Sequence, residues 1–168
     1  MNHSNRRLFV GLLFSSAALL LGGPAQAAEK KAAAEPASIP LASLPAAVQA
    51  TVREQTKGAV IRNISKEIEN GKTVYEIETK VGTRSRDMIV GADGALMVVE
   101  SQVVLDSLPE PVRSTFVKNT GKGKIVVLES VTLGDSLAYY EAQIMTAGKR
   151  SEVKVDPSGH LVVDAKKK

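Results

Sequence analysis

Two stretches of the chain decide the expected fold because one nearly repeats the other: Ser43-Leu44-Pro45-Ala46-Ala47-Val48 and Ser107-Leu108-Pro109-Glu110-Pro111-Val112. The second stretch follows the first at a distance of 64 residues. Two further pairs recur at a distance of 65 residues: Tyr75-Glu76 with Tyr140-Glu141, and Gly94-Ala95-Leu96 with Gly159-His160-Leu161. Recurrence at a nearly fixed distance predicts one structural unit used twice, with one residue inserted near Gly121-Lys122-Gly123.

Each copy is expected to open with a short helix. Pro45 suits the first helical turn, where a missing N–H costs nothing. Leu44, Val48 and Val52 fall on one side at helical spacing, and Gly58 can adopt the left-handed conformation that ends a helix. The second copy has the same pattern in Leu108, Pro109, Val112, Phe116 and Gly121.

Strand signals follow each helix. In the first copy they cover 60–68, 73–81, 84–90 and 96–104, and Asn70-Gly71 is a strong two-residue hairpin turn. In the second copy they cover 125–133, 138–146, 150–155 and 161–164. The predicted fold class is therefore α+β, with two tandem repeats that each pack one helix on a four-stranded antiparallel sheet.

Each helix is expected to cover one face of its sheet. In the first copy the helix should rest on Tyr75, Ile77, Met88, Val90 and Leu96. In the second copy it should rest on Tyr140, Ile144, Val153, Val155 and Leu161, and Val98 and Val163 are expected to join these two cores.

The ends of the chain predict export. Residues 1–27 have the form of a signal peptide, with Arg6 and Arg7, a short apolar stretch and the small-x-small site Ala25-Gln26-Ala27. An uncleaved anchor is the alternative. Residues 28–42 are expected to be a flexible Ala/Lys/Pro tether, 43–104 and 105–164 the two repeats, and 165–168 a basic tail. The expected location is periplasmic or secreted, with no integral membrane segment after cleavage.

Composition excludes several classes of site. The chain has no cysteine, which rules out disulfides, thiolate zinc sites and a cysteine nucleophile. Without the signal, 20 basic residues face 18 acidic ones, and Lys166, Lys167 and Lys168 exceed that difference. No basic stripe for nucleic acid is expected. His160, alone in the mature chain, makes neither a triad nor a transition-metal site, so no catalytic, metal or cofactor residue is predicted.

The sheet face turned away from the helices is the candidate partner surface, because it mixes apolar groups with carboxylates. Its predicted residues are Val74, Glu76, Glu78, Ile89, Tyr139, Glu141, Gln143 and Met145. Alternatively, the apolar groups are internal because the two sheets form one layer or pack together. Glu76 and Glu78 could also act as paired carboxylates of a hydrolase, although Gln143 replaces the second carboxylate in the other copy.

Both copies resemble the PepSY domain pattern of a tyrosine, an alternating strand, a glycine turn, a further strand, and an Asp/Gly turn before a closing apolar residue. In the second copy these are Tyr140 to Ile144, Gly148, Ser151 to Val155, Asp156, Gly159 and Leu161. In the first copy they are Tyr75 to Thr79, Gly82, Arg86 to Val90, Asp93, Gly94 and Leu96. With its Leu-Pro helices, the chain looks like a secreted tandem PepSY-like protein, an architecture shared with the beta-lactamase inhibitory protein.

The resemblance implies a non-catalytic exported binding module that regulates or inhibits a secreted or periplasmic peptidase or another envelope protein. Its expected partner is a protein or peptide. The chain lacks tryptophan, whereas the inhibitory relatives grip their targets with an aromatic-rich face. The alternative function is binding of a small ligand, a cation or a cationic peptide in the cell envelope.

Overall fold

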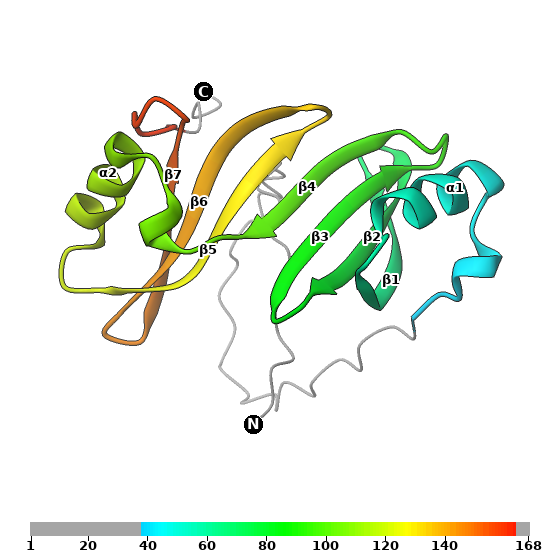
Figure 1. The fold of residues 1–168 in the computed structure, drawn as a ribbon, viewed down its shortest axis with the longest axis horizontal. Coiled ribbons are helices and arrows are strands. Elements are labelled where there is room, and N and C mark those ends of the chain that lie inside the picture. The colour runs from blue at the N-terminus through cyan, green and yellow to red at the C-terminus, as the bar shows by residue number, and fades with distance from the viewer. Residues whose placement is uncertain (1–37, 164–168) are drawn as a thin grey trace, which may run out of the picture. The chain divides into compact units, whose positions relative to one another are not determined.

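A computed structural model describes residues 38–163 as one antiparallel sheet of seven strands, in the order β1-β2-β3-β4-β5-β6-β7, with two α-helices (Figure 1). The α-helices are α1 (Ala46–Gln55) and α2 (Glu110–Thr120), each preceded by a 3-10 turn, η1 (Leu41–Ser43) or η2 (Leu105–Ser107). The strands are β1 (Val60–Glu69), β2 (Lys72–Val81), β3 (Arg84–Gly91), β4 (Leu96–Gln102), β5 (Lys124–Leu133), β6 (Ser136–Thr146) and β7 (Lys149–Val155).

The expectation of two four-stranded sheets is wrong. Strand β4 pairs with β5 from Val98–Leu133 to Gln102–Glu129, so the two expected sheets are a single sheet. The strand expected at 161–164 is reduced to an isolated bridge between Val155 and Leu161 within the described residues. This arrangement has a physical reason, because a strand left at an edge exposes unpaired N–H and C=O groups, and β4 and β5 satisfy each other's.

Local signals placed the elements well. Helix α1 begins directly after Pro45, and α2 begins directly after Pro109. The turn between β1 and β2 contains Asn70 and Gly71 with φ values of 51° and 74°, as a two-residue hairpin turn requires.

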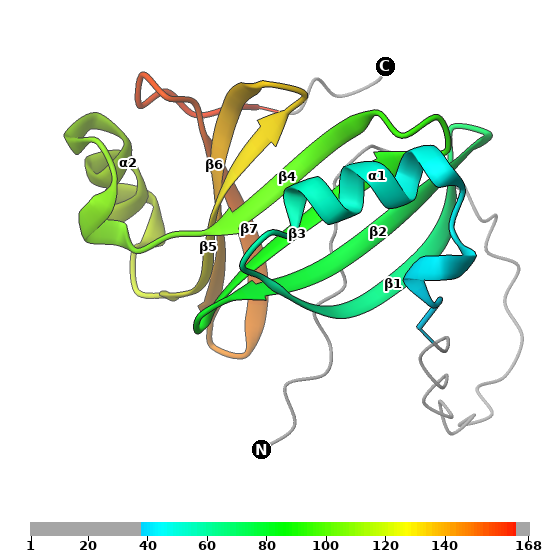
Figure 2. The same ribbon diagram turned by 45° about the vertical axis from the view of Figure 1, so that its right-hand side comes forward.

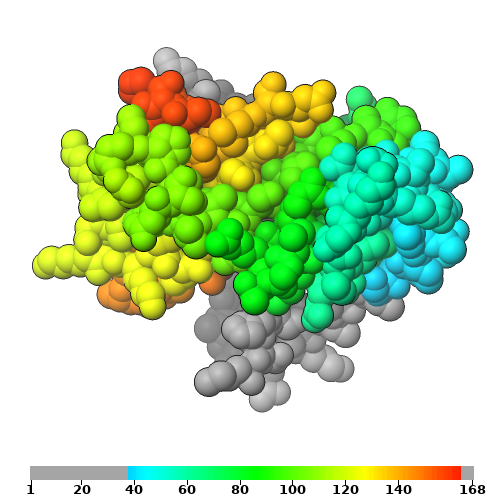
Figure 3. All heavy atoms as spheres, viewed as in Figure 1, coloured from blue at the N-terminus to red at the C-terminus, as the bar shows by residue number. Residues whose placement is uncertain are grey.

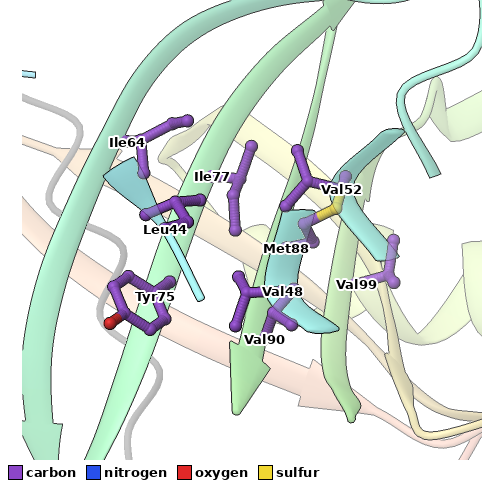
Figure 4. Packing of buried hydrophobic residues seen from close by; sticks show 9 residues of the cluster. All are labelled: Leu44, Val48, Val52, Ile64, Tyr75, Ile77, Met88, Val90 and Val99. Carbon is purple, nitrogen blue, oxygen red and sulfur yellow. The ribbon is translucent and has the colours of Figure 1, made fainter. Parts of the chain in front are cut away.

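The core lies between the sheet and its two helices. Figure 4 shows the cluster under α1, in which Val48 and Val52 of the helix meet side chains of the sheet. The buried members of this cluster are Leu44, Val48, Val52, Ile64, Tyr75, Ile77, Met88, Val90 and Val99. The cluster under α2 contains Leu108, Val112, Phe116, Leu128, Ala142, Ile144 and Val155.

Both helices cover the same face of the sheet. Val99 belongs to the cluster under α1, and Val103, four residues further along the same chain segment, packs against the cluster under α2. Side chains an even number of residues apart on an extended segment point the same way. Figure 2 shows α1 crossing over β3, and Figure 3 shows both helices at the surface on this side.

Three residues expected in the core lie elsewhere. Leu161 and Val163 are 49% and 81% exposed, because the segment that carries them makes only one bridge to the sheet. Val98 is buried but faces away from α1. The register of β3 with β4 shifts between Ile89–Val98 and Val90–Leu96, so Met97 is an extra residue that reverses the alternation. Val99 takes the place beneath α1 instead.

Each helix is fixed to the sheet by a glycine turn. The Thr51 hydroxyl donates to the carbonyl oxygen of Gly94 at 2.6 Å, and the Thr115 hydroxyl donates to that of Gly159 at 2.7 Å. Both glycines have positive φ, 88° and 93°. A Cβ there would lie 2.9 Å from Ala47 in α1 and 2.6 Å from Pro111 in α2. Only glycine therefore allows this close approach.

Candidate functional site

The candidate site is the sheet face opposite α1 and α2, which we name the open face because no helix among residues 38–163 packs on it. The register places all eight predicted surface residues there. Glu76 pairs with Ile89 across β2 and β3, Ile89 with Val98, and Val98 with Leu133 across the β4–β5 junction. Tyr139 and Glu141 on β6 face Val131 and Glu129 on β5. Their role in binding a partner stays a prediction.

The open face is neither fully solvated nor fully closed. Val74 and Ile89 are buried, at 2% and 3% exposed, and Glu141 is 7% exposed. The remaining predicted residues are half-buried: Glu76, Glu78, Tyr139, Gln143 and Met145. Part of the alternative interpretation is therefore correct, because the two expected sheets do form one layer and some of the apolar groups are buried.

A diagonal row of carboxylates crosses the open face, with one acid on each strand from β2 to β7. We name this row the acidic belt, and its members are Glu76, Asp87, Glu100, Glu129, Glu141 and Glu152. Four of the six are buried, with exposed fractions of 5% to 7%: Asp87, Glu100, Glu129 and Glu141. Since burial disfavours the charged form of a carboxylate, these residues set the electrostatics of the face.

Sequence reasoning missed Glu100 and Glu129 as members of this surface. Glu100 was hidden because Val98 was assigned to the covered face, and that assignment turns Glu100 inward too. The available signal was the alternation from Val99: with Val99 under α1, Glu100 must face the other way. Glu129 follows by the same reasoning from Leu128, which lies in the core under α2.

The belt holds protons more tightly than ordinary carboxylates do. Burial raises the pKa of Glu100 to about 8, and nearby carboxylates add to the shift: Glu129, Glu141, Asp87 and Glu76. Burial also raises the pKa of Glu76 to about 7, helped by the charges of Glu67, Glu78 and Asp87. At neutral pH a proton therefore occupies part of the belt instead of a counter-charge.

Lys154 is the cation at one end of the belt. Its ammonium lies 3.1 Å from a Glu152 oxygen, 3.7 Å from a Glu141 oxygen and 5.2 Å from the centre of the Tyr139 ring. Burial raises the pKa of Glu141 to about 7, with Glu152 adding to the shift and Lys154 opposing it. The belt therefore accepts an alkylammonium group at this end, against both carboxylates and an aromatic ring.

The paired carboxylates considered for hydrolysis are engaged with neighbouring side chains. A Glu78 oxygen accepts a hydrogen bond from the Asn63 amide at 3.2 Å, and a Glu76 oxygen accepts one from the Ser65 hydroxyl at 3.5 Å. Within the described part of the chain, no group of three or more histidine, aspartate or glutamate side chains is placed to hold a metal ion.

Comparison with known proteins shows the fold and no family. No family model matches the chain, and no curated protein matches it. Among solved structures, a DUF2874 family protein from Bacteroides ovatus matches with a TM-score of 0.58 and 16% identity, over 72% of this chain and 86% of that one. A predicted periplasmic protein from Bacteroides eggerthii matches with a TM-score of 0.60 and 13% identity, over 71% and 86%.

A BLIP-like protein from Bacteroides fragilis also matches, with a TM-score of 0.54 and 14% identity, over 70% of this chain and 82% of that one. The architecture expected from the beta-lactamase inhibitory protein therefore agrees with a solved neighbour, while the PepSY resemblance stays a prediction. The expected periplasmic or secreted location agrees with the Bacteroides eggerthii neighbour. Within residues 38–163, no helix has the length and apolar character needed to span a bilayer.

Proposed function

We propose that this chain is an exported, non-catalytic module that binds a protein partner in the cell envelope on its open face. The observation that carries the proposal is a sheet face with no helix over it among residues 38–163, on which buried apolar residues adjoin a row of carboxylates. A face meant only for solvent would be polar throughout.

The solved neighbours support this proposal. One has been described as BLIP-like and another as a predicted periplasmic protein, and both share the fold. The partner that fits best is a secreted or periplasmic peptidase, or another envelope protein, which the module regulates or inhibits. Because interface hot spots are enriched in tryptophan, tyrosine and arginine, Tyr139 is the aromatic anchor that the open face provides.

The alternative is that the open face holds a small ligand, a cation or a cationic peptide. One observation favours it, namely the acidic belt with a pKa of about 8 at Glu100. The two proposals differ in what remains on the face: a protein partner uses Tyr139 and Met145, whereas a small cation uses the carboxylates alone.

A crosslinking experiment with matched variants tests the proposal. The mature chain, residues 28–168, is incubated with periplasmic extract, crosslinked and analysed by mass spectrometry, and peptidase activities are assayed in parallel. The variant Y139R/M145R alters the open face, while V117R places the same charge on α2, where Val117 is 59% exposed. Thermal melting of each variant reports whether it is folded.

We expect one partner to be captured by the wild type and by V117R, and lost from Y139R/M145R with its melting temperature kept. Equal capture by all three proteins, or capture of nothing with no effect on any peptidase, would refute the proposal. If Y139R/M145R unfolds, the milder Y139A and M145A variants repeat the comparison.

A further inference from the structure

Charge is segregated in this molecule. Residues 38–163 contain 15 basic and 15 acidic side chains, so their formal charges cancel. The acidic belt nevertheless gathers six of those acids on the open face, where Lys154 is the neighbouring cation. A neutral fold with one strongly acidic face presents a directed electrostatic surface.

Glu100 at the centre of the belt has no counter-charge. It is 7% exposed, and its carboxylate makes no hydrogen bond or ion pair with any residue between 38 and 163. The groups that act on it are all acidic: Glu129, Glu141, Asp87 and Glu76. A buried polar group without a partner costs free energy, and that cost is removed when a ligand supplies the missing partner.

We propose that the acidic belt receives an extended segment of the partner protein that carries lysine or arginine side chains, with one of these cations seated between Glu100 and Glu141. This inference rests on the proposed function and deepens it, because it names the chemistry of the partner's contact.

The dimensions of the belt fit an extended peptide. Neighbouring strands lie about 4.8 Å apart, so the carboxylates from β2 to β6 span about 19 Å. An extended chain covers that distance in about six residues. Side chains that alternate along such a segment place a cation every second residue, which gives about three cations for the belt.

The apolar residues beside the belt favour long cationic side chains over a bare ion. Ile89 and Val98 pair next to Asp87 and Glu100, and Val131 lies directly opposite Glu100 on β5. Lysine and arginine pack their methylene stems on apolar surface while their charged ends reach carboxylates. Lys154 already does this within the fold, with its ammonium between Tyr139 and Glu141.

Binding of a cation should release protons from the belt. An added positive charge favours the ionised form of Glu100, and of the acids that face it from the neighbouring strands, Asp87, Glu129, Glu141 and Glu76. Lys154, Glu152 and Tyr139 act at the other end of the belt. Affinity should therefore rise between pH 6 and pH 8.5, where the free belt loses its protons.

Isothermal titration calorimetry tests this inference on the mature chain. The probe is a capped eight-residue peptide of alternating lysine and alanine, and its matched control has glutamine in place of lysine. Titration in two buffers of different ionisation enthalpy measures the protons released. The variants are E100Q, which keeps the shape of a protonated Glu100, and D135N, an exposed turn residue outside the belt. The charge-neutral tail variant K166A/K167A/K168A tests whether this chain's own lysines occupy the belt.

We expect the lysine peptide to bind at pH 8 with proton release, and to bind about tenfold more weakly in E100Q, with fewer protons released, while D135N matches the wild type. Raising the salt from 50 mM to 300 mM should weaken binding as well. Equal binding of the glutamine peptide, or an E100Q variant that matches the wild type in both measurements, overturns the inference. Binding seen only in the tail variant also overturns it, because the occupant is then this chain's own C-terminus.

The two proposals fail separately. A partner captured through Tyr139 and Met145 but equally by E100Q would leave the proposed function in place and remove the cationic contact. Loss of all capture with intact binding of the lysine peptide would do the reverse.

Discussion

Glu100 shows how one residue couples the stability of this fold to pH. Its pKa is raised from about 4.5 to about 8 by burial and by neighbouring acids. Between those two values the unfolded chain ionises while the native chain keeps its proton. Stability therefore falls as pH rises from about 4.5 to about 8, and it levels off beyond the native pKa. Such a carboxylate opposes folding under the conditions in which a cationic ligand would bind it.

We predict that E100Q is more stable than the wild type at pH 8 and equal to it at pH 4.5. Glutamine keeps the shape and removes the ionisation, so the gain at pH 8 should be about 1–3 kcal/mol. Thermal melting followed by circular dichroism at the two pH values measures it. The D135N variant should show no such pH-dependent gain, because Asp135 is exposed. A destabilised E100Q at pH 8 would mean that the ionised carboxylate has a stabilising partner.

At the scale of the elements, each helix depends on a glycine turn beneath it. Gly94 and Gly159 both combine a positive φ with less than 3 Å between an added Cβ and the helix. Gly134 also has a positive φ, 56°, but an added Cβ there meets nothing within 4 Å. The three positions thus separate backbone strain from the loss of helix packing.

We predict that G94A and G159A each lower the free energy of unfolding by about 2–4 kcal/mol, from strain together with a steric clash. G134A carries the strain alone and should cost about 1 kcal/mol. Urea unfolding followed by circular dichroism compares them. A G94A variant no less stable than G134A would show that α1 can move away from its turn without loss.

The elements were predictable from local sequence, and their assembly was not. Pro45, Pro109 and the Asn70-Gly71 turn fixed the helix starts and the first hairpin to within a residue or two, because each acts through its own backbone. The pairing of β4 with β5 depends on residues about thirty positions apart, and no local pattern encodes it. The bulge at Met97 likewise left no local signal, so Val98 and Glu100 were placed on the wrong face.

At the scale of the whole molecule, the question is whether one sheet makes one folding unit. The two hydrophobic clusters under α1 and α2 share no residue. They are joined by the β4–β5 ladder and by side chains buried at that junction, Val98 at 6% and Val131 at 1% exposed. Unfolding of the second half would expose both side chains and leave β4 as an unpaired edge. The first half should therefore not persist alone.

We predict that F116A, which removes a fully buried ring from α2, destabilises both halves equally. Loss of this side chain should cost about 3–5 kcal/mol, whereas V117A on the exposed side of the same helix should cost little. Native-state hydrogen exchange measures the effect at Ile77 on β2 and at Ala142 on β6. If the sheet unfolds as one unit, both amides exchange faster by the same factor in F116A. Faster exchange at Ala142 with an unchanged rate at Ile77 would show two independent units that share a sheet without sharing stability.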